Sequence, residues 1–183
     1  MYFALIYYPK IYNEAFHAFR KKYDPWHFVL PPHVPFIFPT PVKIGRTKLE
    51  NHITKVLRKW EKFDVLFNTI EKTSDHWMFL GASAGKEKVI RLHDELYTDV
   101  LAPHLRTDLP FDPQIGLGVF SKQKYDVNNP AALLQFDSAR FYKALDEFKR
   151  IGFEIICTID RLVLVKLNAD FNQCEDLRTF LLA

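Results

Sequence analysis

The sequence has few cysteines and no pattern of metal ligands. Its two cysteines, Cys157 and Cys174, form no C-x-x-C pair and no cluster with histidine. This spacing argues against a structural zinc site and against a disulfide framework, so we expect two reduced, buried thiols. A Gly-rich phosphate loop, a nucleophile elbow and a carboxylate cluster with metal spacing are also missing. The sequence therefore predicts no metal and no other cofactor.

A strong net charge is missing as well. The 25 basic and 22 acidic residues give a net charge of +3 and are interspersed along the chain. A charge this small does not attract nucleic acid by itself, so any anionic ligand must be recognised locally.

The chain lacks a segment suited to cross a membrane. Residues 25–42 contain no Asp, Glu, Lys or Arg, but their six prolines would break a membrane-spanning helix. The apolar N-terminal stretch MYFALIYYPK has no basic leader and no small-residue cleavage site. We therefore expect a cytoplasmic protein without a membrane partner, acting as a monomer.

Apolar residues are abundant, at 48% of the 183 residues, with 15% aromatic. This is ample material for one core, and we expect residues 1–183 to form a single domain made of two pseudo-symmetric lobes.

Hydrophobic periodicity predicts an order of strands and helices that occurs twice. In the first half we expect a strand at 2–8, a helix at 11–23, an extended segment at 27–38, a helix at 48–60 and a strand at 62–72. In the second half we expect a strand at 76–83, a helix at 86–105, an extended segment at 111–120 and a helix at 138–151. For residues 153–167 we expect one long bent strand or a hairpin, and for the C-terminal stretch LRTFLLA we expect an edge strand. The predicted fold class is α+β, with duplicated β-α-β lobes and antiparallel sheets around a central cleft.

The stretch LPPHVPFIFP, residues 30–39, has a counterpart in the second half. If it is a strand, alternation places His33, Pro35 and Ile37 on one face. The corresponding stretch DPQIGLGVF aligns Gln114 with His33 and Gly116 with Pro35. Two copies of one motif on related strands would converge across a pseudo-twofold axis, which predicts a ligand site in the cleft between the lobes.

In this pattern the chain resembles the two-histidine phosphoesterases, which include 2′-5′ RNA ligase-like proteins and cyclic nucleotide phosphodiesterases. The resemblance runs from YFALIYYP through PPHVPFIFP and FDPQIGLGVF to IDRLVLVKL. The mark of that family is a duplicated His-x-Thr/Ser, in which residues i and i+2 of a strand point at one phosphate. The resemblance implies one histidine as general base, the other as general acid, and hydroxyls that hold phosphoryl oxygens without a metal.

This sequence departs from the family pattern at three of its four positions. Only His33 is kept; Pro35 and Gly116 replace the two hydroxyl residues, and Gln114 replaces the second histidine. Glutamine can donate a hydrogen bond but cannot transfer a proton near neutral pH. Loss of a positioned proton-transfer group costs about two to four orders of magnitude in rate. The usual acid/base mechanism is therefore expected to be absent.

Three functions remain open. The protein can be a degenerate member that binds a phosphate-bearing small molecule or an RNA terminus, with His33, Gln114, Pro35 and Gly116 around the ligand. It can be an active phosphodiesterase, for 2′,3′-cyclic or 2′-5′ phosphodiesters, in which His33 is catalytic with a partner outside the motif. It can also be a protein-interaction scaffold.

The other histidines are His17, His27, His52, His76, His93 and His104. Residues 121–137 are a candidate lid over the cleft.

Overall fold

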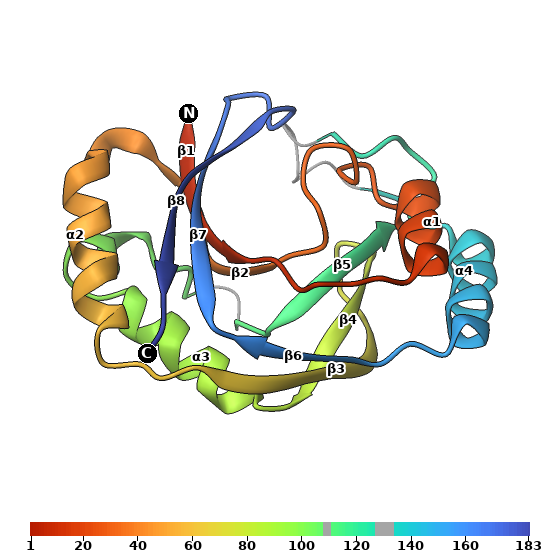
Figure 1. Ribbon diagram of the computed structural model, residues 1–183. Helices are drawn as coiled ribbons and strands as arrows, with labels where there is room; N and C mark the ends of the chain where they lie inside the picture. Colours follow the sequence, from red (N-terminus) through yellow and green to blue (C-terminus); the bar gives the residue numbers. More distant parts are fainter. Residues whose placement is uncertain (108–110, 127–133) are drawn as a thin grey trace.

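A computed structural model describes residues 1–107, 111–126 and 134–183. Two similar runs of elements follow one another along the chain (Figure 1). The first run is β1 (Tyr2–Tyr7), α1 (Glu14–Tyr23), β2 (Val34–Pro41), α2 (Arg46–Leu57) and β3 (Phe63–Lys72). The second run is β4 (Trp77–Ala84), α3 (Lys86–Leu96), β5 (Gln114–Val119), α4 (Ser138–Ile151) and β6 (Ile155–Ile159). The chain ends with β7 (Arg161–Leu167) and β8 (Cys174–Leu181).

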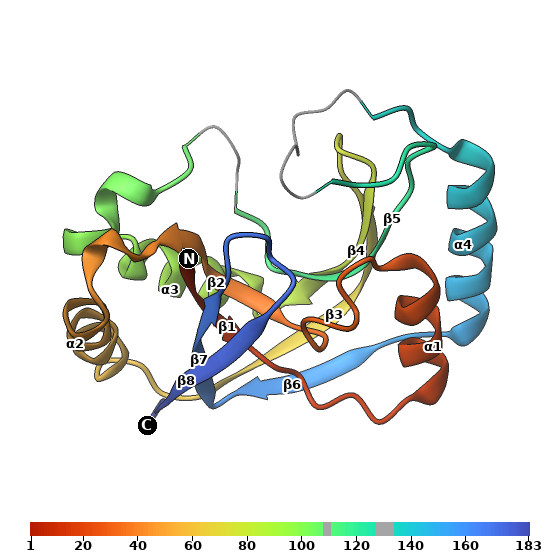
Figure 2. The ribbon, with the colours of Figure 1, turned by 90° about the horizontal axis from the view of Figure 1, so that it is seen from above.

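The strands form two antiparallel sheets. Sheet A has the order β2-β1-β7-β8, and sheet B has the order β5-β4-β3-β6. Helices α1 and α4 pack together beside β5, whereas α2 and α3 pack together on the side of β2 and β8 (Figure 2). The repeated element order and the two antiparallel sheets confirm the predicted α+β fold of duplicated lobes.

The two edge strands that carry the motif share an irregularity. In each, the pairing with the neighbouring strand skips one residue close to the motif, Phe36 in β2 and Leu117 in β5; β2 has a second irregularity between the pairs of Phe3 and Leu5. The flanking pairs are Leu5 with Ile37 and Ile6 with Pro35 in sheet A, and Met78 with Gly118 and Phe79 with Gly116 in sheet B. Such bulges bend a strand and redirect its side chains. The matching bulges support the alignment of Pro35 with Gly116 made from the sequence.

The same bulge makes one sequence prediction wrong. Strict alternation predicts that His33, Pro35 and Ile37 share a face, but Phe36 and Ile37 are both buried in the core. The extended segment predicted at 27–38 is also too long, because residues 25–29 form turns and β2 begins at Val34. His33 therefore lies immediately before the strand.

Helix ends follow local hydrogen bonds that periodicity does not reveal. The helix predicted at 11–23 begins only at Glu14, because the Asn13 side chain accepts a hydrogen bond from the backbone of Phe16 and caps it. The helix predicted at 86–105 ends at Leu96 and is followed by a short 3-10 helix at Asp99–His104. Helix α4 has the predicted bounds, 138–151.

Residues 153–167 join the two sheets. The chain leaves β6 in sheet B and enters β7 in sheet A after Asp160, and these two strands do not pair with each other. Of the two predicted forms, the bent strand is therefore nearer to the structure than the hairpin. The final stretch forms part of β8, an edge strand of sheet A as predicted.

One main core runs through both sheets. Leu5 and Leu164 of sheet A and Phe67 and Leu80 of sheet B belong to the same buried cluster.

Cys157 and Cys174 are free thiols, and burial raises the pKa of each to about 11. Within the described ranges, no helix has the length and apolar character needed to cross a bilayer.

Candidate functional site

The two motif strands come into contact although they belong to different sheets. Strands β2 and β5 are each an edge of their sheet, and Cα atoms of the two strands approach within 8 Å (Figure 2). The ring centroids of Phe38, in β2, and Phe111, just before β5, are 6.0 Å apart. The fold therefore brings the two motif-bearing strands into contact.

Solvent exposure follows the same pattern in both copies. The first and third motif positions are partly exposed and the middle position is buried. In the first copy these residues are His33, Val34 and Pro35, and in the second they are Gln114, Ile115 and Gly116. Within each three-residue motif, the residues proposed from the sequence are thus the accessible ones.

The ring of His33 is held in one tautomer. Its Nδ1 lies 2.9 Å from the carbonyl oxygen of Pro31, which can only accept, so Nδ1 carries the hydrogen. Burial lowers the pKa of His33 below its ordinary value of 6.5, and the nearby charge of Arg20 lowers it further. The bond to Pro31 and the carboxylate of Asp24 oppose this shift without reversing it. At pH 7 the imidazole is neutral, and Nε2 is a proton acceptor.

The hydroxyl positions of the family motif carry no polar side chain here. Pro35 lies in an edge strand, where a proline does not interrupt a ladder on both sides. At Gly116, an added Cβ atom would lie 3.8 Å from the rings of Phe79 and Trp77, which is ordinary van der Waals contact. There is consequently room at Gly116 for a larger residue.

A hydroxyl and a carboxylate lie beside Gly81, the residue of β4 that pairs with Gln114. Gln114 pairs with Gly81 of β4, and the place of the absent Gly81 side chain is taken by groups from β3. These groups are the carboxylate of Glu71 and the hydroxyl of Thr69, which donates a 3.2 Å hydrogen bond to it. Neither residue belongs to the motif predicted from the sequence. The available signal was Gly81 itself, since a glycine inside a strand often marks a close approach of other groups.

Aromatic rings border the same face near Gly116. Trp77 stacks on Phe79 with a centroid distance of 5.8 Å, and it contacts Trp26 at 5.7 Å and Tyr125 at 5.5 Å. Tyr125 belongs to the candidate lid at 121–137, of which residues 127–133 lie outside the described residues.

Most of the other histidines bond a backbone carbonyl. The pairs are His17 with Ile11, His27 with Asp24, His52 with Leu96, His76 with Leu134 and His93 with Phe36. These bonds account for their positions without a catalytic role. In the described part of the chain, no three His, Cys, Asp or Glu side chains gather so as to hold a metal ion.

Comparisons with known proteins agree with this architecture. TT0787 of Thermus thermophilus is 16% identical, and the match covers 100% of this chain and 98% of that one, with a TM-score of 0.62. Escherichia coli LigT in its apo form is 15% identical, with 99% and 95% covered and a TM-score of 0.60. LigT complexed with 3′-AMP is 14% identical, and the match covers 99% of this chain and 96% of that one, with a TM-score of 0.57. These likenesses show the fold. No curated protein matches the chain in sequence.

A sequence profile covers most of the chain. The profile of the 2′-5′ RNA ligase superfamily matches residues 8–171. Together with the duplicated lobes and the two neighbouring edge strands, this match shows that the chain belongs to the 2′-5′ RNA ligase superfamily of two-histidine phosphoesterases.

Proposed function

We propose that the protein binds a phosphate-bearing ligand between His33 and Gln114 without the acid/base turnover typical of its family. The ligand is a nucleotide, an RNA end or a small phosphorylated metabolite. The observation that supports this proposal is the matched placement of His33, immediately before β2, and Gln114, the first residue of β5, in two neighbouring edge strands with matching bulges. An imidazole and an amide are both able to hold a phosphoryl oxygen.

The structural relatives support a phosphate ligand. LigT has been solved in complex with 3′-AMP, with ATP and with phosphate. In this chain the amide of Gln114 donates to a phosphoryl oxygen, and Nε2 of His33 donates once it is protonated. A bound anion favours that protonated form.

The same residues argue against turnover. A metal-free phosphodiester transfer needs one group to accept a proton and a second to deliver one. His33, neutral at pH 7, is able to accept a proton, but Gln114 cannot deliver one. Pro35 and Gly116 offer no donor that would stabilise the charge of the transition state.

Calorimetric titration tests the proposal. Nucleotides with a 2′-phosphate, a 2′,3′-cyclic phosphate and a 5′-phosphate are titrated into the natural protein and into the His33→Ala and Gln114→Ala variants. We expect weak, salt-sensitive binding of at least one nucleotide, lost in His33→Ala and weakened in Gln114→Ala. His104→Ala, which changes a histidine of the 3-10 helix after α3, is the control and should bind normally. Absence of heat with all three nucleotides would refute the proposal.

One observation favours the alternative of an active phosphodiesterase. Glu71 and Thr69 lie beside Gly81, the strand partner of Gln114, so a carboxyl group and a hydroxyl are present one strand away from the position that the family motif fills with its second histidine. In that case Glu71 would exchange the proton that Gln114 cannot, with His33 as the other acid/base.

Hydrolysis assays separate the two functions. If the alternative holds, the natural protein cleaves 2′,3′-cyclic nucleotides, and both Glu71→Gln and His33→Ala abolish the cleavage. Glu61→Gln, which changes an exposed glutamate outside the strands, is the matched control. Absence of cleavage by the natural protein would remove this alternative.

A further inference from the structure

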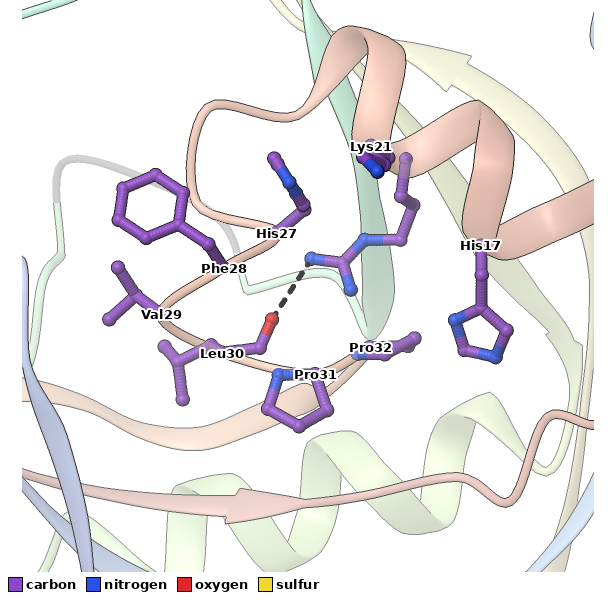
Figure 3. Close-up of a pocket in the computed structure, with 9 residues that line it drawn as sticks. His17, Lys21, His27, Phe28, Val29, Leu30, Pro31 and Pro32 are labelled. Carbon is purple, nitrogen blue, oxygen red and sulfur yellow. Dashed lines mark hydrogen bonds between the residues drawn. The ribbon is translucent and has the colours of Figure 1, made fainter. Parts of the chain in front are cut away.

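A separate pocket of about 400 Å³ lies between α1 and residues 27–32 (Figure 3). This volume is in the range of small-molecule sites. None of the four motif residues lines the pocket. Its walls differ in chemistry: His17, Arg20, Lys21 and His27 form one part, and residues 28–32 form the other. No carboxylate is among the described residues that line it.

Arg20 fixes the shape of this pocket. Its side chain is only 4% exposed, and its guanidinium donates two hydrogen bonds to the carboxylate of Asp24. It also donates to the carbonyl oxygen of Leu30 at 3.4 Å, the bond drawn in Figure 3, and so ties α1 to the opposite wall. Because Asp24 neutralises Arg20, the attraction for an anion must come from the other basic residues.

Lys21, His17 and His27 each have a polar side-chain atom that bonds none of the described residues. None of the described residues forms an ion pair or a side-chain hydrogen bond with Lys21, so its charge is not compensated by them. Nε2 of His17 and Nδ1 of His27 each donate to a backbone carbonyl, which leaves the second nitrogen of each ring without a bond to any described residue. Lys21 and His17 project from α1, as Figure 3 shows, and His27 lines the same pocket. One ammonium and two imidazoles thus border the same space.

The opposite wall is apolar and carries an exposed aromatic ring. Phe28 is 71% exposed and lies beside the ring of His27, with a centroid distance of 5.6 Å. Val29, Leu30, Pro31 and Pro32 continue the wall. A well-exposed phenyl ring next to prolines suits contact with a flat ring of a ligand.

We propose that this pocket is a second ligand site, for a phosphate monoester attached to an aromatic ring. The phosphate accepts from the ammonium of Lys21, and from the second ring nitrogens of His17 and His27 when these carry a hydrogen, and the ring lies against Phe28 and Pro31. This inference does not depend on the proposed function, because it uses neither Gln114 nor Gly116. The pocket nevertheless adjoins the motif, since the carbonyl of Pro31 holds the ring of His33.

Binding of phenyl phosphate tests the inference directly. Amide resonances of the full chain are followed by NMR during titration with phenyl phosphate, inorganic phosphate and phenol. We expect phenyl phosphate to shift resonances of α1 and residues 27–32, and to bind more tightly than either of its halves. Lys21→Ala should weaken binding by about tenfold, as for loss of one charge-assisted hydrogen bond. Phe28→Ala should weaken it by roughly fivefold through loss of the ring contact.

Matched variants exclude a general surface effect. Lys22→Ala removes the next lysine of α1, which pairs with Glu147, and Tyr12→Ala removes another exposed ring, 89% accessible. Both should bind phenyl phosphate as the natural protein does. His33→Ala should keep the shifts in α1, which separates this site from the one at the motif. The inference is overturned if millimolar phenyl phosphate shifts no resonance of this pocket, or if inorganic phosphate binds equally well. Unchanged affinity in both Lys21→Ala and Phe28→Ala would overturn it too.

Discussion

At the scale of single residues, the tautomer of His33 makes ligand binding depend on pH. Its hydrogen lies on Nδ1, and burial keeps its pKa below 6.5. A phosphoryl oxygen that bonds Nε2 needs a second hydrogen on the ring, so binding must take up a proton. We expect nucleotide affinity to rise as the pH falls from 8 toward 6. Calorimetry in buffers of different ionisation enthalpy measures the uptake, and the same heat in every buffer would contradict it.

Restoring the family motif tests the assignment of each motif residue. Gln114→His alone should give little hydrolysis of 2′,3′-cyclic nucleotides, because no hydroxyl would hold the phosphate. The triple variant Gln114→His, Gly116→Thr and Pro35→Thr should give measurable turnover, since each proton-transfer group contributes about two to four orders of magnitude. The space beside Gly116 admits the new side chain. If the triple variant folds and is as inactive as the natural protein, the assigned geometry is wrong.

At the scale of elements, the contact between α1 and β5 depends on one glycine. A Cβ atom at Gly118 would lie 2.6 Å from Cβ of Tyr23 and 2.8 Å from its backbone oxygen, at the end of α1. Because backbone atoms cannot move aside easily, Gly118→Ala should lower the free energy of unfolding by about 1–3 kcal/mol. Gly116→Ala is the control, because a Cβ atom at this position, two residues away, would lie 3.8 Å from its nearest neighbours. It should change the free energy of unfolding by less than about 1 kcal/mol. Urea denaturation measures both, and equal losses would contradict this account.

Hydrophobic periodicity predicts the bounds of a helix well where a capping residue stands at the end of the apolar pattern. Helix α4 follows its apolar stripe and ends at Ile151, and it is capped by Gly152, whose φ of 65° favours a glycine. The bulge at Phe36 was not predictable, because it depends on pairing with β1 and leaves two successive residues buried. Gly81 signals a close approach of other groups, but only the register of three strands identifies these groups as Glu71 and Thr69 and places them one strand away from Gln114. The sequence thus identifies the accessible motif positions, whereas their surroundings come from tertiary pairing.

At the scale of the whole molecule, two histidines make stability depend on pH. Burial lowers the pKa of His33 and of His93, whose Nδ1 donates to the carbonyl of Phe36. The unfolded chain then binds protons more readily than the folded one. Stability is therefore full above about pH 6.5 and decreases as the pH falls below it.

Urea denaturation between pH 7.5 and 5.5 measures this decrease. His93→Asn keeps a side-chain donor and removes the titration, so its stability should change less over that range, whatever its stability at pH 7.5. An equal slope in the variant and the natural protein would show that His93 does not contribute.

The central claim is that the site at His33 and Gln114 binds a phosphate ligand without converting it. Phosphorus-31 NMR of a 2′,3′-cyclic nucleotide incubated with the protein follows both events in one sample, at pH values from 5 to 9. The account predicts a shifted or broadened ligand signal that returns to its free position with His33→Ala, and no product signal above that of buffer alone. A product signal from the natural protein that disappears with His33→Ala, or an unperturbed ligand signal at every pH, would contradict it.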